Sequence, residues 1–199
     1  MQYATLLRIE DPENERVALE GMLRYIDMVA ELQSGIVIGW AKGNIRESSS
    51  REAYFEKLTK NLRILDEAAA KCNVPIVVEV INHYEVDVFK TARETYSYLK
   101  ENHFRNCFVH LDTFHMLLEE ENFVKAIQTA SPRLGYFHFA DTTRWHPGSG
   151  YMDYKPILRT LDEVGYHGYL TIECFPHDNA KDAAVKGLRY LKSVESALF

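Results

Sequence analysis

The chain has 199 residues, of which 46% are apolar and 26% charged, and its formal net charge is −6. This length predicts one domain over residues 1–199, and the acidic balance argues against a nucleic-acid partner, which needs a positive surface. No run of about 18 apolar residues is present, so we expect no membrane-spanning segment and no membrane partner. The N-terminus has neither the basic start nor the apolar core of a signal peptide, so we expect a cytoplasmic protein.

Helical and extended patterns alternate along the whole chain. The periodicity of apolar residues predicts, in chain order, a helix over 16–32, a strand over 35–40, a helix over 51–71, a strand over 76–81, a helix over 88–101, a strand over 107–111, a helix over 122–130, a strand over 135–139, a helix over 154–164, a strand over 169–173 and a helix over 180–197. Short strands that are apolar on both faces and separated by helices are typical of a parallel sheet with helical crossovers. The pattern therefore predicts an α/β protein, either a (β/α) barrel or a doubly wound sheet.

Three cysteines lie beside apolar residues and show no Cys-x-x-Cys spacing: Cys72, Cys107 and Cys174. That spacing is the usual mark of a metal or redox motif. We therefore expect buried free thiols and no disulfide framework.

Polar residues recur at the carboxyl ends of four successive strands: Glu79, Asp112, His138 and Glu173. Glu79 is the most unexpected of them, because it follows a fully apolar run and a buried carboxylate is costly without a partner. In a barrel these strand ends converge on one mouth, where catalytic groups lie. Three carboxylates and one imidazole suit Mn²⁺, Co²⁺ or Mg²⁺ better than a thiolate zinc site. The alternative is that each acid is a separate strand-end cap or salt bridge, and its recurrence in step with the strands argues against this.

Four segments carry a resemblance to a known family: "EVINHYE", "HLDTFHM", "FHFADTTRWHPGSG" and "YLTIECF". They resemble the sugar isomerase/epimerase branch of the xylose isomerase-like TIM barrels, which includes the D-tagatose and D-psicose (ketose) 3-epimerases. The resemblance implies an α/β fold of the TIM (β/α)8 type. It also implies a divalent metal, Mn²⁺ or Co²⁺ with Mg²⁺ as an alternative, and a small ketose or related sugar as substrate. We further expect a homo-oligomer.

The resemblance further assigns roles to individual residues. Glu79, Asp112, His138 and Glu173 would be the metal ligands, and Glu79 and Glu173 would also be the catalytic acid/base pair. The substrate-binding residues would be Glu85, His115 and Arg144. His83 departs from the family pattern, in which arginine or another large residue is common at this position.

These residue types suit proton transfer next to a ketose carbonyl. Epimerisation removes a proton on one face of a carbon and returns one on the other, which requires two bases. The enediolate formed in between needs stabilisation, which a metal supplies as a Lewis acid. Alternatives within the superfamily are hydroxypyruvate or inosose-type isomerisation, dehydration or lyase chemistry on a sugar-like substrate. A non-catalytic truncated barrel that binds metal, sugar or a partner is a further alternative, whereas an abasic-site endonuclease is disfavoured by the acidic charge and the few histidines at strand ends.

The number of strands departs from the family. A full barrel has eight strands and about 250 residues, whereas five secure strands are predicted here. By their motifs they resemble the fourth to eighth strands of the family, and "QYATLL" (2–7) could be a remnant of the third. The sequence is compatible with a fragment, with a short protein that dimerises through the gap, or with a mis-assigned start. In each case the barrel is expected to be incomplete, with five to six βα units and exposed strand edges.

Five further residues near the motifs have two interpretations each. Asp141 could support His138 or cap a turn, and His146 could be a ligand or a solvent-facing loop residue. Trp40 and Trp145 could line a sugar pocket or fill the core. His110 lies within a strand, and we interpret it as a core histidine with satisfied hydrogen bonds.

Overall fold

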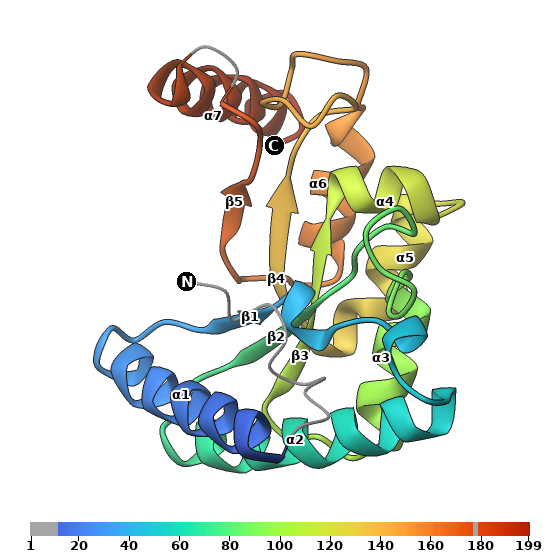
Figure 1. Cartoon of the computed structure of the whole chain (residues 1–199). Coiled ribbons are helices and arrows are strands. Elements are labelled where there is room, and N and C mark those ends of the chain that lie inside the picture. Colours follow the sequence, from blue (N-terminus) through green and yellow to red (C-terminus); the bar gives the residue numbers. More distant parts are fainter. Residues whose placement is uncertain (1–11, 177–178) are drawn as a thin grey trace.

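The computed structural model describes residues 12–176 and 179–199, and it shows the expected alternation of helices and strands (Figure 1). The α-helices are α1 (Pro12–Glu31), α2 (Arg51–Lys71), α3 (Ala92–Glu101), α4 (Thr113–Glu119), α5 (Phe123–Ala130), α6 (Tyr154–Glu163) and α7 (Ala180–Ser196). The strands are β1 (Ile36–Ile38), β2 (Ile76–Glu79), β3 (Cys107–Asp112), β4 (Leu134–Phe139) and β5 (Leu170–Ile172). Short 3₁₀ turns follow β1 at Trp40–Lys42 and Ile45–Glu47 and precede β4 at Ser131–Arg133. The suggested strand remnant at 2–7 lies outside the described residues.

All five strands are parallel and lie in the sheet in chain order, β1-β2-β3-β4-β5. This order, with a helical connection between each pair, is the arrangement of part of a TIM barrel and confirms the predicted fold. A doubly wound sheet would require the strand order to reverse at some point. Because every strand runs in the same direction, the carboxyl ends of all five meet at one edge of the sheet.

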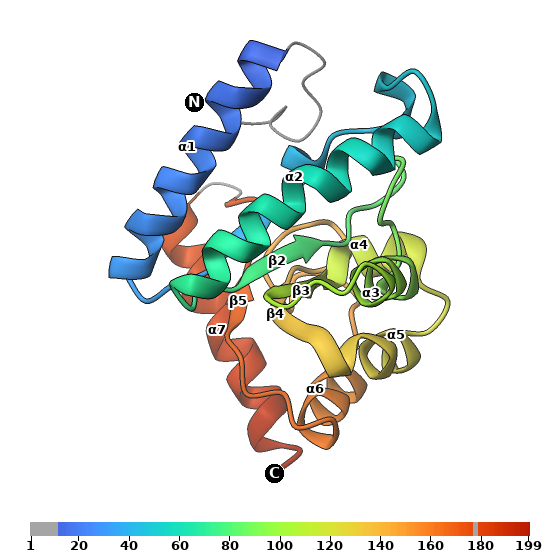
Figure 2. The same ribbon diagram turned by 90° about the horizontal axis from the view of Figure 1, so that it is seen from below.

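The helices cover the outer side of the curved sheet. Figure 2 shows α1, α2, α3, α5, α6 and α7 following one another around it, and successive helices pack against each other at α1–α2, α3–α5, α5–α6 and α6–α7. Leu58, Leu62 and Leu65 of α2 are fully buried in the resulting core, together with strand residues such as Val78 and Val109. Burial of such side chains stabilises the fold by about 1.5–3 kcal/mol each. The positions that face the core are therefore apolar, and their spacing gives the helical and strand periodicities of this sequence.

Two helices differ from the sequence prediction. The helix predicted from residue 88 begins only at Ala92, because the side chain of Thr91 caps it by accepting a hydrogen bond from the Glu94 N–H. Residues 88 and 89 are apolar because they are buried, and Phe89 has a left-handed φ of 54° that interrupts a helix. The short helix α4 was not predicted, and it begins directly after the carboxylate of Asp112.

The sheet is open between β1 and β5, which are its outer strands. Val37 of β1 and Leu170 of β5 are partly exposed, and the neighbouring Tyr169 is 83% exposed. A cavity of about 710 Å³ lies at the amino ends of the strands and is lined by Val37, Val77, Tyr136 and Tyr169, among other residues. In a closed barrel further strands would cover these edges, so the described residues form an incomplete barrel, as expected.

The cysteine prediction is confirmed in part. All three thiols are free, but only Cys107 is buried, whereas Cys72 is exposed and Cys174 intermediate. Cys72 follows the last residue of α2, where the chain turns at the protein surface. Among the described residues, no helix has the length and apolar character needed to cross a membrane.

Candidate metal centre

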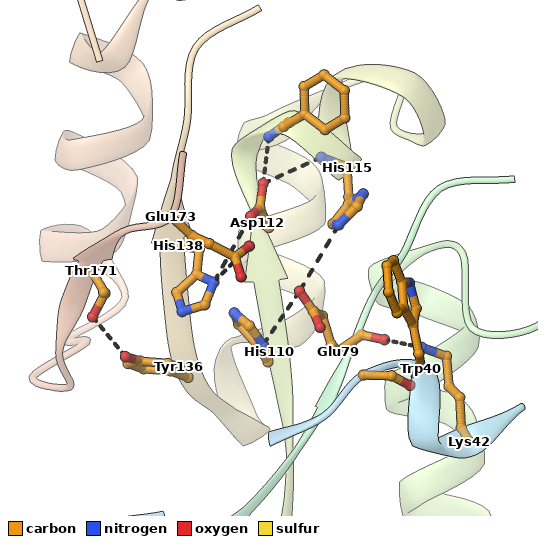
Figure 3. A network of polar contacts seen from close by, with 12 residues as sticks. Trp40, Lys42, Glu79, His110, Asp112, His115, Tyr136, His138, Thr171 and Glu173 are labelled. Carbon is orange, nitrogen blue, oxygen red and sulfur yellow. Dashed lines mark hydrogen bonds and ion pairs between the residues drawn. The ribbon is translucent and has the colours of Figure 1, made fainter. Parts of the chain in front are cut away.

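Four side chains converge at the carboxyl ends of β2 to β5: Glu79, Asp112, His138 and Glu173 (Figure 3). One ligand atom from each lies within 4.8 Å of the others. His138 Nδ1 is 3.4 Å from Glu173 Oε2 and 3.9 Å from Asp112 Oδ2. The structure therefore brings together the four residues that the sequence singled out as metal ligands.

The sheet register places these residues. Asp112 and His138 are paired positions on β3 and β4, and Glu173 follows the last residue of β5. The other Asp112 carboxylate oxygen, Oδ1, accepts hydrogen bonds from the Phe114 and His115 N–H groups at the start of α4. Asp112 thus caps a helix with one oxygen and presents the other to the cluster, so the cap and ligand interpretations do not exclude each other.

A glycine makes room for Glu79. A Cβ atom built on Gly39, which follows β1, would lie 2.5 Å from Glu79 Oε2. Real Cβ atoms essentially never approach another atom so closely. Only a residue without a side chain therefore lets the Glu79 carboxylate adopt this position.

The donor set fits a divalent cation. Asp112 Oδ2 and His138 Nδ1 are buried and have no hydrogen-bond partner among the described residues. Buried polar atoms without partners are rare and costly, and a bound ion is one way to satisfy them. Four carboxylates and two basic side chains lie in or beside the cluster. The carboxylates are Glu79, Glu85, Asp112 and Glu173, and the cations are Lys42 and Arg144.

The environments of the carboxylates shift their pKa values in opposite directions. Burial raises the pKa of Glu79 to about 7 and that of Asp112 to about 7. The neighbouring imidazole of His138 lowers the pKa of Glu173 to about 2, and this carboxylate is also less buried. The two outer members of the cluster therefore differ in their readiness to hold a proton.

The three residues predicted to bind substrate surround this cluster. Arg144 contacts Glu173 Oε2 and His115 Nε2, each at 3.2 Å, and its guanidinium is 3.7 Å from Glu85 Oε1. His115 is almost fully buried, and its Nε2 lies 3.9 Å from Glu79 Oε1. The geometry joins Glu85, His115 and Arg144 to the cluster through direct contacts.

Trp40 belongs to the site and not to the core. It is 62% exposed, and its indole N–H donates a hydrogen bond to Glu85 Oε2 at 2.9 Å. The Asn82 side chain donates to the other Glu85 oxygen and also contacts His115 Nδ1. This network fixes Glu85 in place beside the cluster.

Asp141 shapes the loop that carries Arg144. Its carboxylate accepts hydrogen bonds from the backbone N–H groups of Thr142, Gly148 and Met152. Of the two interpretations of Asp141, the structure favours the turn cap. His146 lies in the same loop and contacts the carbonyl oxygen of Pro147 through Nδ1.

The sequence analysis missed Lys42. This lysine is fully buried in the 3₁₀ turn after β1, and its ammonium group donates to the Gly39 and Glu79 carbonyl oxygens (Figure 3). Burial lowers the pKa of Lys42 to about 7. The sequence offered no signal, because a single lysine two residues after the strand predicted over 35–40 is normally solvent-exposed.

His110 was interpreted incorrectly in one respect. It is fully buried in β3, as expected, but neither ring nitrogen has a hydrogen-bond partner among the described residues. Its Nδ1 lies 4.0 Å from Glu79 Oε1, and its ring packs edge-on against that of His138 at a centroid distance of 4.1 Å. The interpretation as a satisfied core residue is therefore wrong, because the barrel interior at this level is polar and not hydrocarbon.

Comparisons with known proteins agree with this arrangement. L-ribulose 3-epimerase from Methylomonas sp. (strain DH-1) is 35% identical over 139 residues, which are 70% of this chain and 48% of that protein. Ketose 3-epimerase from Arthrobacter globiformis is 29% identical over 176 residues, which are 86% of this chain and 60% of that protein. The crystal structure of D-allulose 3-epimerase from Methylomonas sp. in complex with D-allulose has a TM-score of 0.82 at 28% identity, covering 96% of this chain and 73% of that one.

The chain thus spans about half of the first of these curated relatives and 60% of the second. The sequence model of the family described as "Xylose isomerase-like TIM barrel" matches residues 4–194, nearly the whole chain. This match confirms the resemblance carried by the four strand-end motifs. The chain belongs to the xylose isomerase-like TIM barrel family.

Proposed function

We propose that the protein is a metal-dependent sugar isomerase or epimerase of the ketose 3-epimerase type. The observation that carries this proposal is the position of Glu79 and Glu173. They come from β2 and β5, on either side of the Asp112–His138 pair of β3 and β4, and both reach the cluster. Two carboxylates that approach one centre from opposite sides are what removal and return of a proton at one carbon require. The similarity to named ketose and ribulose 3-epimerases supports the same reaction.

A divalent cation held by Glu79, Asp112, His138 and Glu173, Mn²⁺ or Co²⁺ by preference, would supply Lewis-acid polarisation of the substrate carbonyl. One glutamate takes the proton from the carbon next to the carbonyl. The C–H bonding pair moves into the new carbon–carbon double bond, the π pair of the carbonyl moves onto its oxygen, and an enediolate forms. The other glutamate donates a proton to the opposite face, which restores the ketone with inverted configuration. Arg144, His115 and Glu85 hold the hydroxyl groups that flank the reacting carbon, since their polar atoms surround the same space.

The two glutamates differ in protonation before the ion binds. The neighbouring His138 lowers the pKa of Glu173 to about 2, so this carboxylate is ionised at neutral pH. Burial raises the pKa of Glu79 to about 7, so part of the metal-free protein holds a proton there.

Deuterium exchange followed by NMR tests the proposal. The protein is incubated with Mn²⁺ or Co²⁺ in D₂O with fructose, psicose, tagatose, sorbose, ribulose and xylulose, and loss of the C3 proton is followed, with C1 observed for isomerase chemistry. We expect metal-dependent exchange in the unchanged protein and its loss in Glu79→Gln and Glu173→Gln. Asp66→Asn is the matched control, because Asp66 is a buried carboxylate that accepts hydrogen bonds from Arg105 and Asn106, close to the amino end of β3.

The substrate panel also separates the alternative reactions. Exchange at C1 alone would indicate an aldose–ketose isomerase, and turnover of hydroxypyruvate or an inosose would indicate the related isomerase, dehydratase or lyase reactions. Absence of exchange with every sugar, in folded protein that demonstrably holds the metal, would refute catalysis by this chain. A truncated barrel that binds metal or sugar without turnover would then be the better description.

A homo-oligomer is part of the proposal. The two outer strands β1 and β5 have unpaired edges, and exposed strand edges are commonly covered by another chain. Exposed apolar surface is added by Trp40, which follows β1, and by Leu170 and Phe175, which lie in and after β5. Light scattering after size-exclusion chromatography tests this, and a monomer at micromolar concentration would contradict it. A cytoplasmic location stays a prediction from the sequence.

A further inference from the structure

One buried side chain at the cluster has no role in the proposed reaction. His110 lies on β3 two residues before Asp112, so both side chains point to the same face of the strand, with His110 one step deeper in the barrel. It is fully buried, and both of its ring nitrogens lack a hydrogen-bond partner among the described residues. An imidazole buried in this state is costly unless something binds it.

The surroundings of His110 form a second set of metal-ligating atoms. Ligand atoms of Glu79, His110 and His138 all lie within 4.8 Å of one another, and all three residues are buried. Figure 3 shows the His110 ring between Glu79 and His138. His110 is also the register partner of Glu79 on the neighbouring strand, so the backbone holds these two side chains at one level of the sheet.

We propose that Glu79, His110 and His138 form a second, deeper coordination site for a nitrogen-preferring divalent cation such as Zn²⁺. Two imidazoles and one carboxylate are the protein ligands of many catalytic zinc sites, in which the fourth position stays open. The set of Glu79, Asp112, His138 and Glu173 offers three carboxylates and one imidazole, which suits harder ions such as Mn²⁺. The two sets therefore differ in the ion they favour.

The two sites share Glu79 and His138, so they exclude each other. An ion in the deeper site engages the carboxylate that the proposed reaction needs for proton transfer, and it uses the imidazole that the carboxylate-rich set also needs. Zn²⁺ is therefore a competitor of Mn²⁺ for one binding place per chain. The inference rests on the proposed metal centre but needs no sugar chemistry, because it concerns binding alone.

Two substitutions separate the sites, since each removes a ligand that only one set contains. His110→Leu removes the deeper site and leaves Glu79, Asp112, His138 and Glu173 intact. Asp112→Asn weakens the carboxylate-rich site and leaves the deeper one, while its amide oxygen still caps α4. Dissociation constants for Zn²⁺ alone and Mn²⁺ alone are measured by isothermal titration calorimetry on the full chain, and circular dichroism checks folding. His110→Gln is the second variant if His110→Leu does not fold.

We expect Zn²⁺ affinity to fall at least about tenfold in His110→Leu, the loss known even for indirect partners of metal ligands, with Mn²⁺ affinity unchanged. In Asp112→Asn we expect Mn²⁺ affinity to fall and Zn²⁺ affinity to stay unchanged. In the unchanged protein, Zn²⁺ displaces Mn²⁺ with one ion bound per chain. Unchanged Zn²⁺ affinity in His110→Leu together with its loss in Asp112→Asn would overturn the inference, because Zn²⁺ would then use the carboxylate-rich set. Failure of the unchanged protein to bind Zn²⁺ would overturn it as well. Absence of Mn²⁺ binding alone, with His110-dependent Zn²⁺ binding retained, would refute the proposed function and leave this inference standing.

Discussion

Replacing Gly39 by alanine is a one-atom test of the proposed metal centre. Gly39 follows β1 and belongs to none of the ligand sets, yet its α-carbon faces the Glu79 carboxylate. The new Cβ would lie 2.5 Å from Glu79 Oε2, 3.7 Å from its carboxyl carbon and 3.7 Å from Ile81 Cδ1. The carboxylate oxygen is thus the one atom that must yield.

The size of the effect follows from that distance. Ordinary van der Waals contact for a Cβ begins at 3.4 Å, so the oxygen has to move by about 0.9 Å if the backbone holds. Metal–ligand distances tolerate only about 0.2 Å, and a misplacement of about 1 Å in a reacting group can cost about a hundredfold in rate. We therefore expect Gly39→Ala to weaken Mn²⁺ binding about tenfold to a hundredfold, and to lower the C3 exchange rate by a similar factor at saturating metal.

Calorimetric titration with Mn²⁺ and the deuterium-exchange assay measure these two effects. Gly35→Ala is the control, because it lies just before the same strand and its new Cβ would meet the carbonyl oxygen of Pro75 at 3.0 Å, far from the cluster. It should lower stability slightly and leave Mn²⁺ affinity unchanged. Wild-type metal affinity and exchange in Gly39→Ala would show that the position of Glu79 does not matter, and the proposed role of this residue would fail.

Three further predictions follow from other contacts. Arg144→Lys removes the planar guanidinium that reaches both Glu173 and His115. We therefore expect kcat/KM for the best ketose to fall about tenfold to a hundredfold, while the Mn²⁺ affinity measured by calorimetry stays unchanged. An equal loss of metal affinity would contradict a role in substrate binding. Asp141→Ala leaves three backbone N–H groups of the following loop without their acceptor, so the free energy of unfolding measured in urea should fall by about 3 kcal/mol. Asp141→Asn should lower this free energy by less. Equal losses in the two variants would argue against the role of Asp141 as a turn cap. Burial lowers the pKa of His110 well below its ordinary value of 6.5, so the folded state binds fewer protons than the unfolded state, and this contribution to stability is present above pH 6.5 and is lost as the pH falls. In metal-free protein with chelator, urea unfolding at pH 5, 6 and 7 should therefore show a slope that is smaller in His110→Asn, by up to about 1.4 kcal/mol per pH unit at the acidic end of this range. An unchanged slope would contradict this assignment.

The fold could be predicted from the sequence because its signals are local. Apolar residues at helical spacing in α2 and the strand residues Ile76 and Val78 of β2 face the same core, so periodicity and burial agree. The start of α3 was misplaced because Val88 and Phe89 are apolar for tertiary reasons, namely their burial in the hydrophobic core. Helix α4 was missed because it is short and depends on Asp112 as its cap, and that residue had already been interpreted as a ligand.

The candidate ligands could be found because a parallel sheet converts a recurrence in sequence into proximity in space. Each of Glu79, Asp112, His138 and Glu173 ends or follows its own strand, and the sheet has no change of order between those strands. Gly39 and Lys42 were not found, and His110 was interpreted as a core residue, because their importance comes from neighbouring strands. A buried lysine, a glycine against a carboxylate and an unpartnered imidazole have no signature in the residues beside them.

The strand order also separates metal binding from turnover. The four proposed ligands come from β2, β3, β4 and β5, which pair with one another directly, so the geometry of the cluster requires no strand beyond these four. Lys42 links the end of β1 to the end of β2, because its ammonium group donates hydrogen bonds to one carbonyl group of each.

The side toward the open edges of β1 and β5 is different, because Trp40 follows β1, Phe175 follows β5, and both have most of their surface exposed. A sugar bound between Glu79 and Glu173 would be covered by protein on the strand side and by solvent on the other. Proton transfer to an enediolate is favoured where water is excluded. Tight metal binding with slow C3 exchange would therefore point to the open side of the sheet as the cause. A second chain that covers this side should then raise the exchange rate without changing the metal affinity.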